Sequence, residues 1–161
     1  MKFPFHRQSA NNDCGPTCLK MIAEYYNRHY ELDYLKKKFQ IRKNGVSMLN
    51  MYKTSKAIGF LSRGVKIQVE KLKEKVQHGP AILYCNKNHF VVIYKTPKPR
   101  KKGKFYLADP ANGKLIFEEF EFLKFWIGEK QNHTSKPKTT IEKKSDLKMG
   151  YALCLDHLYN K

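Results

Sequence analysis

The chain contains 161 residues, about the size of one ordinary domain, with 32 Lys and Arg against 14 Asp and Glu. The resulting net charge of +18 predicts an anionic partner, either nucleic acid, an anionic membrane surface or an acidic peptide. Hydrophobic residues make up 41% of the chain, too many for a disordered basic tail. No apolar run approaches the ~18 residues of a transmembrane helix, and the first residues lack the apolar segment of a signal peptide.

The first part of the chain predicts three helices. After an extended segment at residues 3–8, the residues Asp13-Cys14-Gly15-Pro16-Thr17 predict a helix start, because proline is tolerated in a first turn. Apolar side chains at helical spacing continue this helix to about Asn27. Similar spacing predicts a second short helix over residues 32–39. Ser47 is a suitable N-cap for a third helix, which is expected to end near Gly59.

The middle of the chain predicts a strand, a short helix and a hairpin. Alternating apolar residues indicate a strand over residues 65–69, and a brief helix is expected over 70–77. Beyond Gly79-Pro80, the β-branched and aromatic runs 81–85 and 89–94 are separated by a polar turn, which is typical of a β-hairpin.

The last part of the chain predicts three more strands and a helix. Two further apolar runs, at residues 105–108 and 115–117, indicate strands. Apolar residues spaced as Phe120, Leu123 and Ile127 predict a helix that stops at Gly128, and residues 149–155 predict a final strand. These elements come in the order expected of an α+β fold, with helices first and an antiparallel sheet after them.

The organisation of the chain predicts one domain over residues 1–161. Within it, the Lys-, Thr- and Ser-rich residues 129–148 are expected to form a surface loop. The sequence contains no internal repeat and no glycine-rich phosphate loop, so it carries no visible ATPase motif of its own.

Cys14 lies at the expected start of the first helix, between Asp13 and Gly15-Pro16. The partial positive charge of a helix N-terminus favours a thiolate, and small neighbours leave backbone N–H groups open to a developing oxyanion. Both conditions suit a nucleophilic cysteine. The structural alternative is a small buried residue near a helix cap.

Two polar residues at predicted strand ends complete a possible triad with Cys14. His89 begins a strand after a polar turn, where its imidazole could serve as the base that a cysteine nucleophile needs. Asp109 ends the next strand, and a hairpin between the two strands would place its carboxylate beside the His89 ring. The alternatives are a half-exposed histidine at a strand end and a turn-forming aspartate before Pro110.

Gln8 is a candidate for stabilising the oxyanion that a cysteine nucleophile generates. It precedes Cys14 by six residues, so the chain could fold back and direct the side-chain amide at the oxyanion. The alternative is a solvated polar residue in an N-terminal arm.

Several separated motifs, taken together and in this order, resemble the papain-like cysteine peptidase domain of peptidase-containing ABC transporters. That family cleaves leader peptides after a double glycine and exports bacteriocins or related peptides. The resemblance spans Phe3 to about Gly128, and the closing residues 150–155 look like the family's last strand. The motifs are Gln8-x5-Cys14 within a run that continues through Gly15-Pro16-Thr17-Cys18-Leu19, His89-Phe90-Val91-Val92, Asp109-Pro110-Ala111-Asn112-Gly113, and the shorter stretches Gly45-Val46-Ser47 and Phe125-Trp126-Ile127-Gly128.

The resemblance implies a papain-like fold, with N-terminal helices packed on an antiparallel sheet, and a role for each candidate residue. Cys14 would be the nucleophile and His89 the general base, later the general acid. Asp109 would orient the imidazole. Gln8 would stabilise the oxyanion, with the backbone N–H of Cys14 as a second donor. None of these four positions departs from the family pattern.

The function implied is a cysteine endopeptidase that removes the leader of a precursor peptide after a Gly-Gly motif, coupled to export by an ABC transporter. The implied partners are that precursor and the transmembrane and ATP-binding domains of a transporter, which this chain lacks. The implied location is cytoplasmic, at the inner face of the cell membrane when part of the transporter. The alternative is a catalytically silent domain that binds leaders and recruits cargo, against which the presence of Cys14, His89 and Asp109 argues.

No cofactor and no metal are expected. Cys18 lies one helical turn from Cys14, but a zinc site would need further ligands and the sequence contains no second paired-ligand motif. The cysteines are interpreted as reduced thiols, with Cys18 and Cys85 buried.

The remaining residues of interest are apolar or basic. The groove that binds a leader could include Met48, Met51, Tyr52 and Phe60, although such a stripe is more often core. Basic residues at 98–104 and 130–148 are interpreted as loops that could contact an anionic membrane surface or steer acidic leaders. Nucleic acid is not an expected partner, because the sequence contains no basic helix with interleaved aromatics, no RNP motif and no zinc finger.

Overall fold

The computed structural model describes residues 2–40, 46–85, 88–128 and 148–157. The predicted α+β fold is confirmed, although the first strand begins at Phe60 rather than at Val65. Most of the expected loop at 129–148 lies outside the described residues. Along the chain the elements are α1 (Cys14–Tyr25), α2 (Leu32–Phe39), α3 (Met48–Ala57), β1 (Phe60–Gln68), α4 (Val69–Val76), β2 (Ala81–Cys85), β3 (His89–Lys95), β4 (Phe105–Asp109), β5 (Gly113–Phe117), α5 (Glu119–Ile127) and β6 (Met149–His157).

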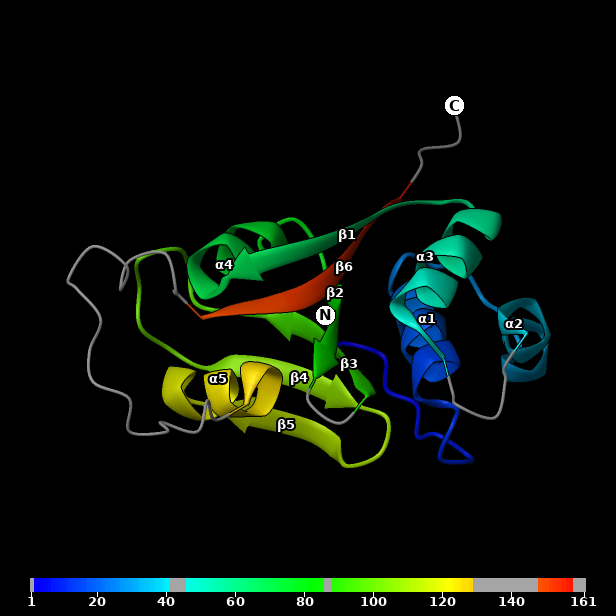
Figure 1. The fold of residues 1–161 in the computed structure, drawn as a ribbon, viewed down its shortest axis with the longest axis horizontal. Helices are drawn as coiled ribbons and strands as arrows, with labels where there is room; N and C mark the ends of the chain where they lie inside the picture. Colours follow the sequence, from blue (N-terminus) through cyan, green and yellow to red (C-terminus); the bar gives the residue numbers. More distant parts are fainter. Residues whose placement is uncertain (1, 41–45, 86–87, 129–147, 158–161) are drawn as a thin grey trace, which may run out of the picture.

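The six strands of the described residues form one antiparallel sheet in the order β1-β6-β2-β3-β4-β5. Strands β2 to β5 follow one another as neighbours. Strand β6, by contrast, lies between β1 and β2 (Figure 1). It pairs along the whole of β1, with Val65 opposite Ala152, and on its other side Leu83 also lies opposite Ala152. The last described strand therefore joins two parts of the sheet that are not otherwise hydrogen-bonded to each other.

Two apolar cores cover the two faces of the sheet, because successive side chains of a strand point to opposite sides. In β3, Phe90 and Val92 pack with the core formed by α1, α2 and α3. Val91 and Ile93, the alternating residues, pack with α4 and α5 instead. Figure 1 shows α1, α2 and α3 grouped together, away from α4 and α5.

Local sequence explains where α3 begins, whereas the buried side of α5 is seen only in the structure. The hydroxyl of Ser47 accepts a hydrogen bond from the Asn50 N–H at 3.1 Å, which confirms the predicted N-cap of α3. In α5 the most deeply buried side chains are Phe122 and Trp126, whereas Phe120 is 62% exposed. The expected spacing thus found the helix but not its buried side. In the described part of the chain, no helix combines the length and the apolar character needed to cross a membrane.

Candidate active site

Cys14 is the first residue of α1 and its side chain is buried. The carbonyl of Asp13 accepts hydrogen bonds from the N–H and the hydroxyl of Thr17, at 3.0 and 2.6 Å, which fixes the first turn. The N–H of Cys14 has no partner within the helix, because the first N–H groups of a helix never do. A side chain at Gly15 would place its Cβ 2.9 Å from the sulfur of Met51, so glycine permits the close packing of α1 on α3.

Cys18 fixes α1 against β3. Its side chain is fully buried, and its Sγ donates to the carbonyl of Phe90 at 3.4 Å. Burial raises the pKa of the Cys18 thiol well above its ordinary value, so this cysteine stays a neutral thiol. Because Phe90 directly follows His89, the contact sets the position of the helix start relative to the histidine.

His89 and Asp109 meet at the end of the sheet where α1 begins. Val92 pairs with Ala108, and extending this register to the strand ends makes His89 and Asp109 diagonal neighbours. The Nε2 of His89 lies 2.7 Å from the Oδ1 of Asp109, whose side chain is fully buried. The sequence-based expectation that the two strand ends bring these residues together is realised in the structure.

The carboxylate of Asp109 also organises the turn that follows β4. Its Oδ1 accepts from the N–H of Ala111 at 2.8 Å and from that of Asn112 at 3.4 Å, and its Oδ2 accepts from the Asn112 side-chain amide at 2.9 Å. The sequence leaves open whether Asp109 forms the turn or orients the His89 ring. In the structure one carboxylate makes both sets of contacts.

These contacts shift two pKa values in opposite directions. The hydrogen bond to Asp109, followed by the interaction with Cys14, raises the pKa of His89 to about 9 against the opposing effect of burial. Burial alone would raise the pKa of Asp109, but the hydrogen bonds from His89, Asn112 and Ala111 hold it below its ordinary value. At neutral pH the pair is therefore an imidazolium beside a carboxylate.

Gln8 lies in the N-terminal arm, which crosses the turn after β4. Its N–H donates to the carbonyl of Pro110 at 2.9 Å, and the neighbouring Arg7 donates to the carbonyl of Ala111 at 3.0 Å. The Oε1 of Gln8 is buried without a hydrogen-bond partner among the described residues. The structure thus brings Gln8 next to the Asp109 turn and leaves its side-chain oxygen uncommitted.

A groove of about 1000 Å³ opens beside Cys14, between the helices and the ends of β2 and β3. The four apolar residues that the sequence suggests for a leader groove do not line this groove. Met51 and Phe60 belong to the core, and Met48 and Tyr52 pack against the core. The groove residues include Asn11, Asn12, Cys14, Val46, Tyr84 and Asn88, with Lys38 and Lys53 from α2 and α3.

The cysteine thiols and the possible metal ligands form no disulfide and no metal site within the described residues. All four cysteines are free, and Cys18 and Cys85 are buried as predicted. Burial also raises the pKa of the Cys85 thiol far above its ordinary value. Among residues 2–40, 46–85, 88–128 and 148–157, no cluster of His, Cys, Asp or Glu side chains is suited to holding a metal ion.

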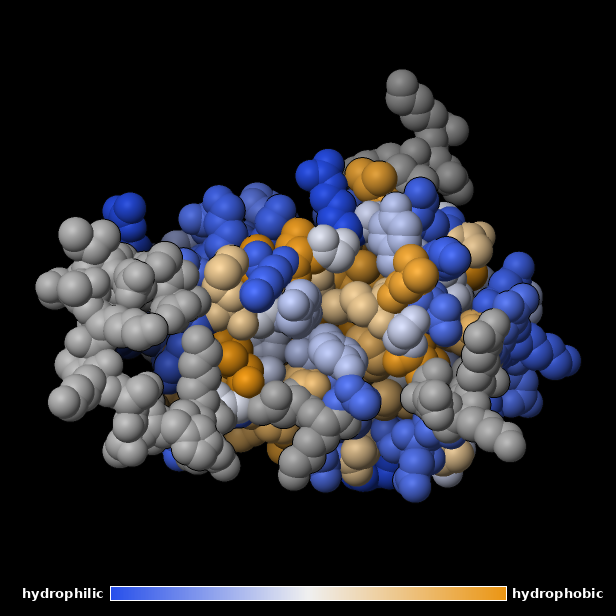
Figure 2. Space-filling view, in the orientation of Figure 1, coloured by the Kyte–Doolittle hydropathy of each residue, from blue (hydrophilic) through white to orange (hydrophobic). Residues whose placement is uncertain are grey.

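Sequence reasoning missed two groups near the site. Asn112 holds Asp109, and the Asp-Pro-x-Asn turn pattern was the signal that could have indicated it. The other is an ion pair between Asp13 and Lys36 of α2, residues that are 23 positions apart and share no motif. Lys36 belongs to a helix over which hydrophilic residues gather in Figure 2.

The chain belongs to the Peptidase C39 family, which its residues 2–132 match. It is 26% identical over 127 residues to the colicin V secretion/processing ATP-binding protein CvaB of Escherichia coli, covering 79% of this chain and 17% of that protein. It is 30% identical over 125 residues to the lactococcin-G-processing and transport ATP-binding protein LagD of Lactococcus lactis subsp. lactis, covering 75% of this chain and again 17% of the relative. The chain thus spans under a fifth of the length of these relatives.

Solved structures agree with this family assignment. The fold matches that of the peptidase domain of Streptococcus ComA with a TM-score of 0.75 at 20% identity, over 98% of this chain and 100% of that one. It also matches a double glycine motif protease from an AMS/PCAT transporter, solved in complex with the leader peptide. That match has a TM-score of 0.72 at 25% identity, and it covers 98% of this chain and 93% of the other.

Proposed function

We propose that this chain, as one domain over residues 1–161, is a cysteine endopeptidase that cleaves the leader from a precursor peptide after a Gly-Gly motif. The observation that carries the proposal is the environment of His89. Its Nε2 is occupied by Asp109 at 2.7 Å, which leaves Nδ1 for the interaction with Cys14. An imidazole held between a carboxylate and a thiol at a helix N-terminus is suited to forming a thiolate–imidazolium pair.

In the first step, the Cys14 thiolate attacks the carbonyl carbon of the second glycine and a C–S bond forms. The carbonyl oxygen becomes an oxyanion, which accepts hydrogen bonds from the N–H of Cys14 and the side-chain amide of Gln8. The imidazolium of His89 then gives its proton to the departing amine, and the C–N bond breaks. The products are a free mature peptide and a thioester between the leader and Cys14.

In the second step, water hydrolyses the thioester. Neutral His89 takes a proton from the water, the hydroxide adds to the thioester carbonyl, and Cys14 leaves as a thiolate. Asp109 keeps the ring in place throughout, because its own position is held by the turn of Ala111 and Asn112. His89 carries the proton again at the end, so the site is restored.

The support for Gln8 as the oxyanion donor is its position. The backbone of Gln8 is bonded to Pro110, directly after Asp109, so the residue is anchored near the other three.

The proposed substrate and partners rest on the relatives. Several are described by their names as secretion/processing or processing and transport proteins, and one matched structure contains a leader peptide. We therefore propose that the chain acts at the cytoplasmic face of the cell membrane with the transmembrane and ATP-binding domains of an ABC transporter. Lys38 and Lys53 in the groove would attract an acidic precursor.

Cleavage of a synthetic precursor with a Gly-Gly motif, followed by mass spectrometry, tests the proposal. Cys14→Ala should lower the rate at least about 10³-fold while fluorescence anisotropy shows unchanged binding. Cys154→Ala is the matched control, since this thiol lies on β6, outside the candidate site, and should leave the rate unchanged. Undiminished cleavage by Cys14→Ala would refute the mechanism. Binding without cleavage by the unmodified chain would favour the silent leader-binding alternative.

A further inference from the structure

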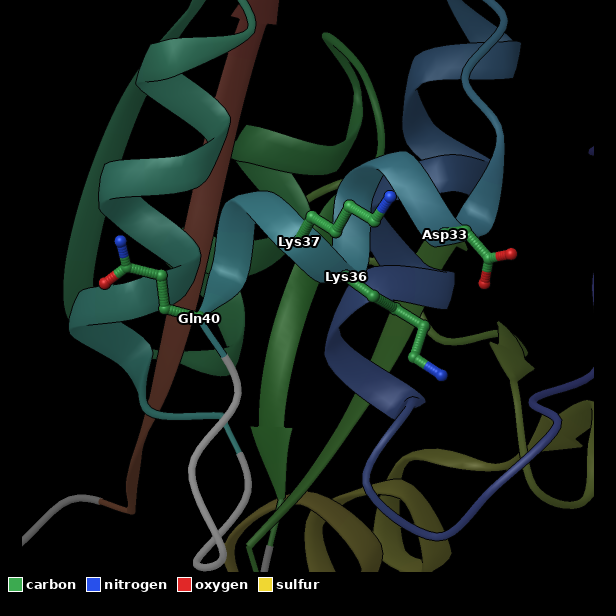
Figure 3. A pocket seen from close by; sticks show the side chains of 4 residues that line it. All are labelled: Asp33, Lys36, Lys37 and Gln40. Atoms are coloured by element: carbon green, nitrogen blue, oxygen red, sulfur yellow. The ribbon is translucent and has the colours of Figure 1, made fainter.

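An ion pair between a buried carboxylate and a partly exposed lysine lies directly beside Cys14. The side chain of Asp13 is 2% exposed, and the Nζ of Lys36 lies 3.3 Å from its Oδ1 and 3.4 Å from its Oδ2. Figure 3 shows the Lys36 side chain extending from α2 toward the start of α1, whereas Lys37 and Gln40 of the same helix point in other directions. The pair thus joins α2 to the residue before the proposed nucleophile.

An unpaired charge on Asp13 would act against the thiolate that the proposed mechanism needs. Asp13 and Cys14 are adjacent in the chain, so a bare carboxylate on one disfavours a second negative charge on the other. Water cannot screen that carboxylate well, because Asp13 is almost fully buried. Among the described residues, the positive group in contact with it is the ammonium of Lys36, whose side chain is about one-third exposed.

We propose that Lys36 is a positioning residue for the reaction. By neutralising Asp13, it removes a negative charge that would otherwise oppose ionisation of Cys14. Lys36 does not touch the substrate or the reacting atoms; it acts through Asp13. The inference rests on the proposed function of Cys14 as the nucleophile and adds the control of its ionisation from a second helix.

Other charged or titratable groups lie around Cys14 and stay unchanged in the test. They are His89 from β3 with Asp109 behind it, Cys18 one turn along α1, and Lys38 on the α2 side of the groove.

The test is the pH dependence of Cys14 alkylation by iodoacetamide, followed on the full chain by peptide mapping between pH 4 and 9. Lys36→Met leaves the Asp13 carboxylate unpaired, so the acid limb of the profile should move up by about one pH unit. Asp13→Asn removes the negative charge and frees the ammonium, so the limb should move down. The double variant should return close to the unmodified profile.

The matched control is Lys37→Met. Lys37 is the next residue on α2, is exposed and points away from Lys36. The Cys14 alkylation profile of this variant should therefore coincide with that of the unmodified chain. If Lys36→Met leaves the limb in place, the inference is wrong. A double variant as strongly shifted as Lys36→Met would also overturn it, because only a structural role of Lys36 predicts that result.

Two further outcomes distinguish a failure of this inference from a failure of folding or of the proposed function. If circular dichroism shows that Lys36→Met does not fold, Asp13→Asn alone decides: a limb that does not move down contradicts the proposal. If Cys14 of the unmodified chain alkylates no faster at pH 6 than a free thiol, then the proposed nucleophile, and with it any role of Lys36, is refuted.

Discussion

The Nε2 of His89 and the Oδ1 of Asp109 lie 2.7 Å apart, and that same oxygen accepts the N–H of Ala111 at 2.8 Å. The turn after β4 and the orientation of the imidazole therefore depend on one carboxylate. A change in the turn is transmitted to His89 through the Asp109 side chain alone.

The raised pKa of His89 predicts how stability depends on pH. Its folded pKa is about 9 and its ordinary value is 6.5, so the stabilisation is fully present below pH 6.5 and is lost as pH rises through about 9. Urea unfolding between pH 6 and 10 measures this loss. His89→Gln should lack it, so the difference in unfolding free energy between the two chains should shrink across that range. A constant difference would contradict the shift.

Replacing Gln8 tests the oxyanion donor. Gln8→Ala should lower kcat about 10²–10³-fold on the Gly-Gly precursor with little change in KM, because the donor is needed only when charge develops on the carbonyl oxygen. Ser9→Ala, at the next and exposed position, serves as the control and should behave like the unmodified chain. A loss that appears in KM alone would instead make Gln8 a binding residue.

Lys73 of α4 links three segments from a buried position. Its Nζ lies 2.7 Å from the Oε1 of Glu70, 3.0 Å from that of Glu119 in α5, and 3.0 Å from the carbonyl of Lys101. Burial alone would lower the pKa of Lys73, but the two glutamates outweigh it and raise the pKa. Lys73→Ala should lower the free energy of unfolding by about 1–3 kcal/mol, since these bonds and the buried stem are lost together.

The control for Lys73 is Lys71 on the same helix. Within the part of the chain that the structure describes, Lys71 pairs only with Glu74, at 2.8 Å, and both side chains are more than half exposed. Lys71→Ala should therefore cost less than about 0.5 kcal/mol. Equal losses in chemical denaturation for the two variants would show that burial of the Lys73 contacts contributes nothing.

Two glycines in paired strands make a further comparison. A Cβ at Gly150 of β6 would lie 2.3 Å from the Trp126 ring, whereas a Cβ at Gly64 of β1 would meet nothing within 4 Å. Gly150→Ala should therefore lower the free energy of unfolding by about 1–3 kcal/mol, as overpacking does. Gly64→Ala should leave it unchanged or raise it slightly. Thermal denaturation of both variants decides the matter, and equal midpoints would rule out the close approach.

The sequence predicted the helices and strands better than it predicted which of them lie next to one another. Local patterns identified the cap at Ser47 and the pairing of β3 with β4, because both depend on residues close together in the chain. The position of β6 between β1 and β2 could not be predicted, since it depends on contacts across most of the chain. The Asp13–Lys36 pair could not be predicted either, because its two residues come from different elements and share no motif. Cys14, His89 and Asp109, by contrast, lie at helix and strand ends that the sequence pattern predicts.

The insertion of β6 also determines when the sheet can form. Until residues 149–157 have been synthesised, β1 and β2 each present an unpaired backbone edge, and such edges bind other chains. Pairings between residues so far apart also slow folding. A nascent chain would thus complete its sheet only after its last strand leaves the ribosome, and a chain cut before Met149 would be prone to aggregate rather than to fold with a weakened edge.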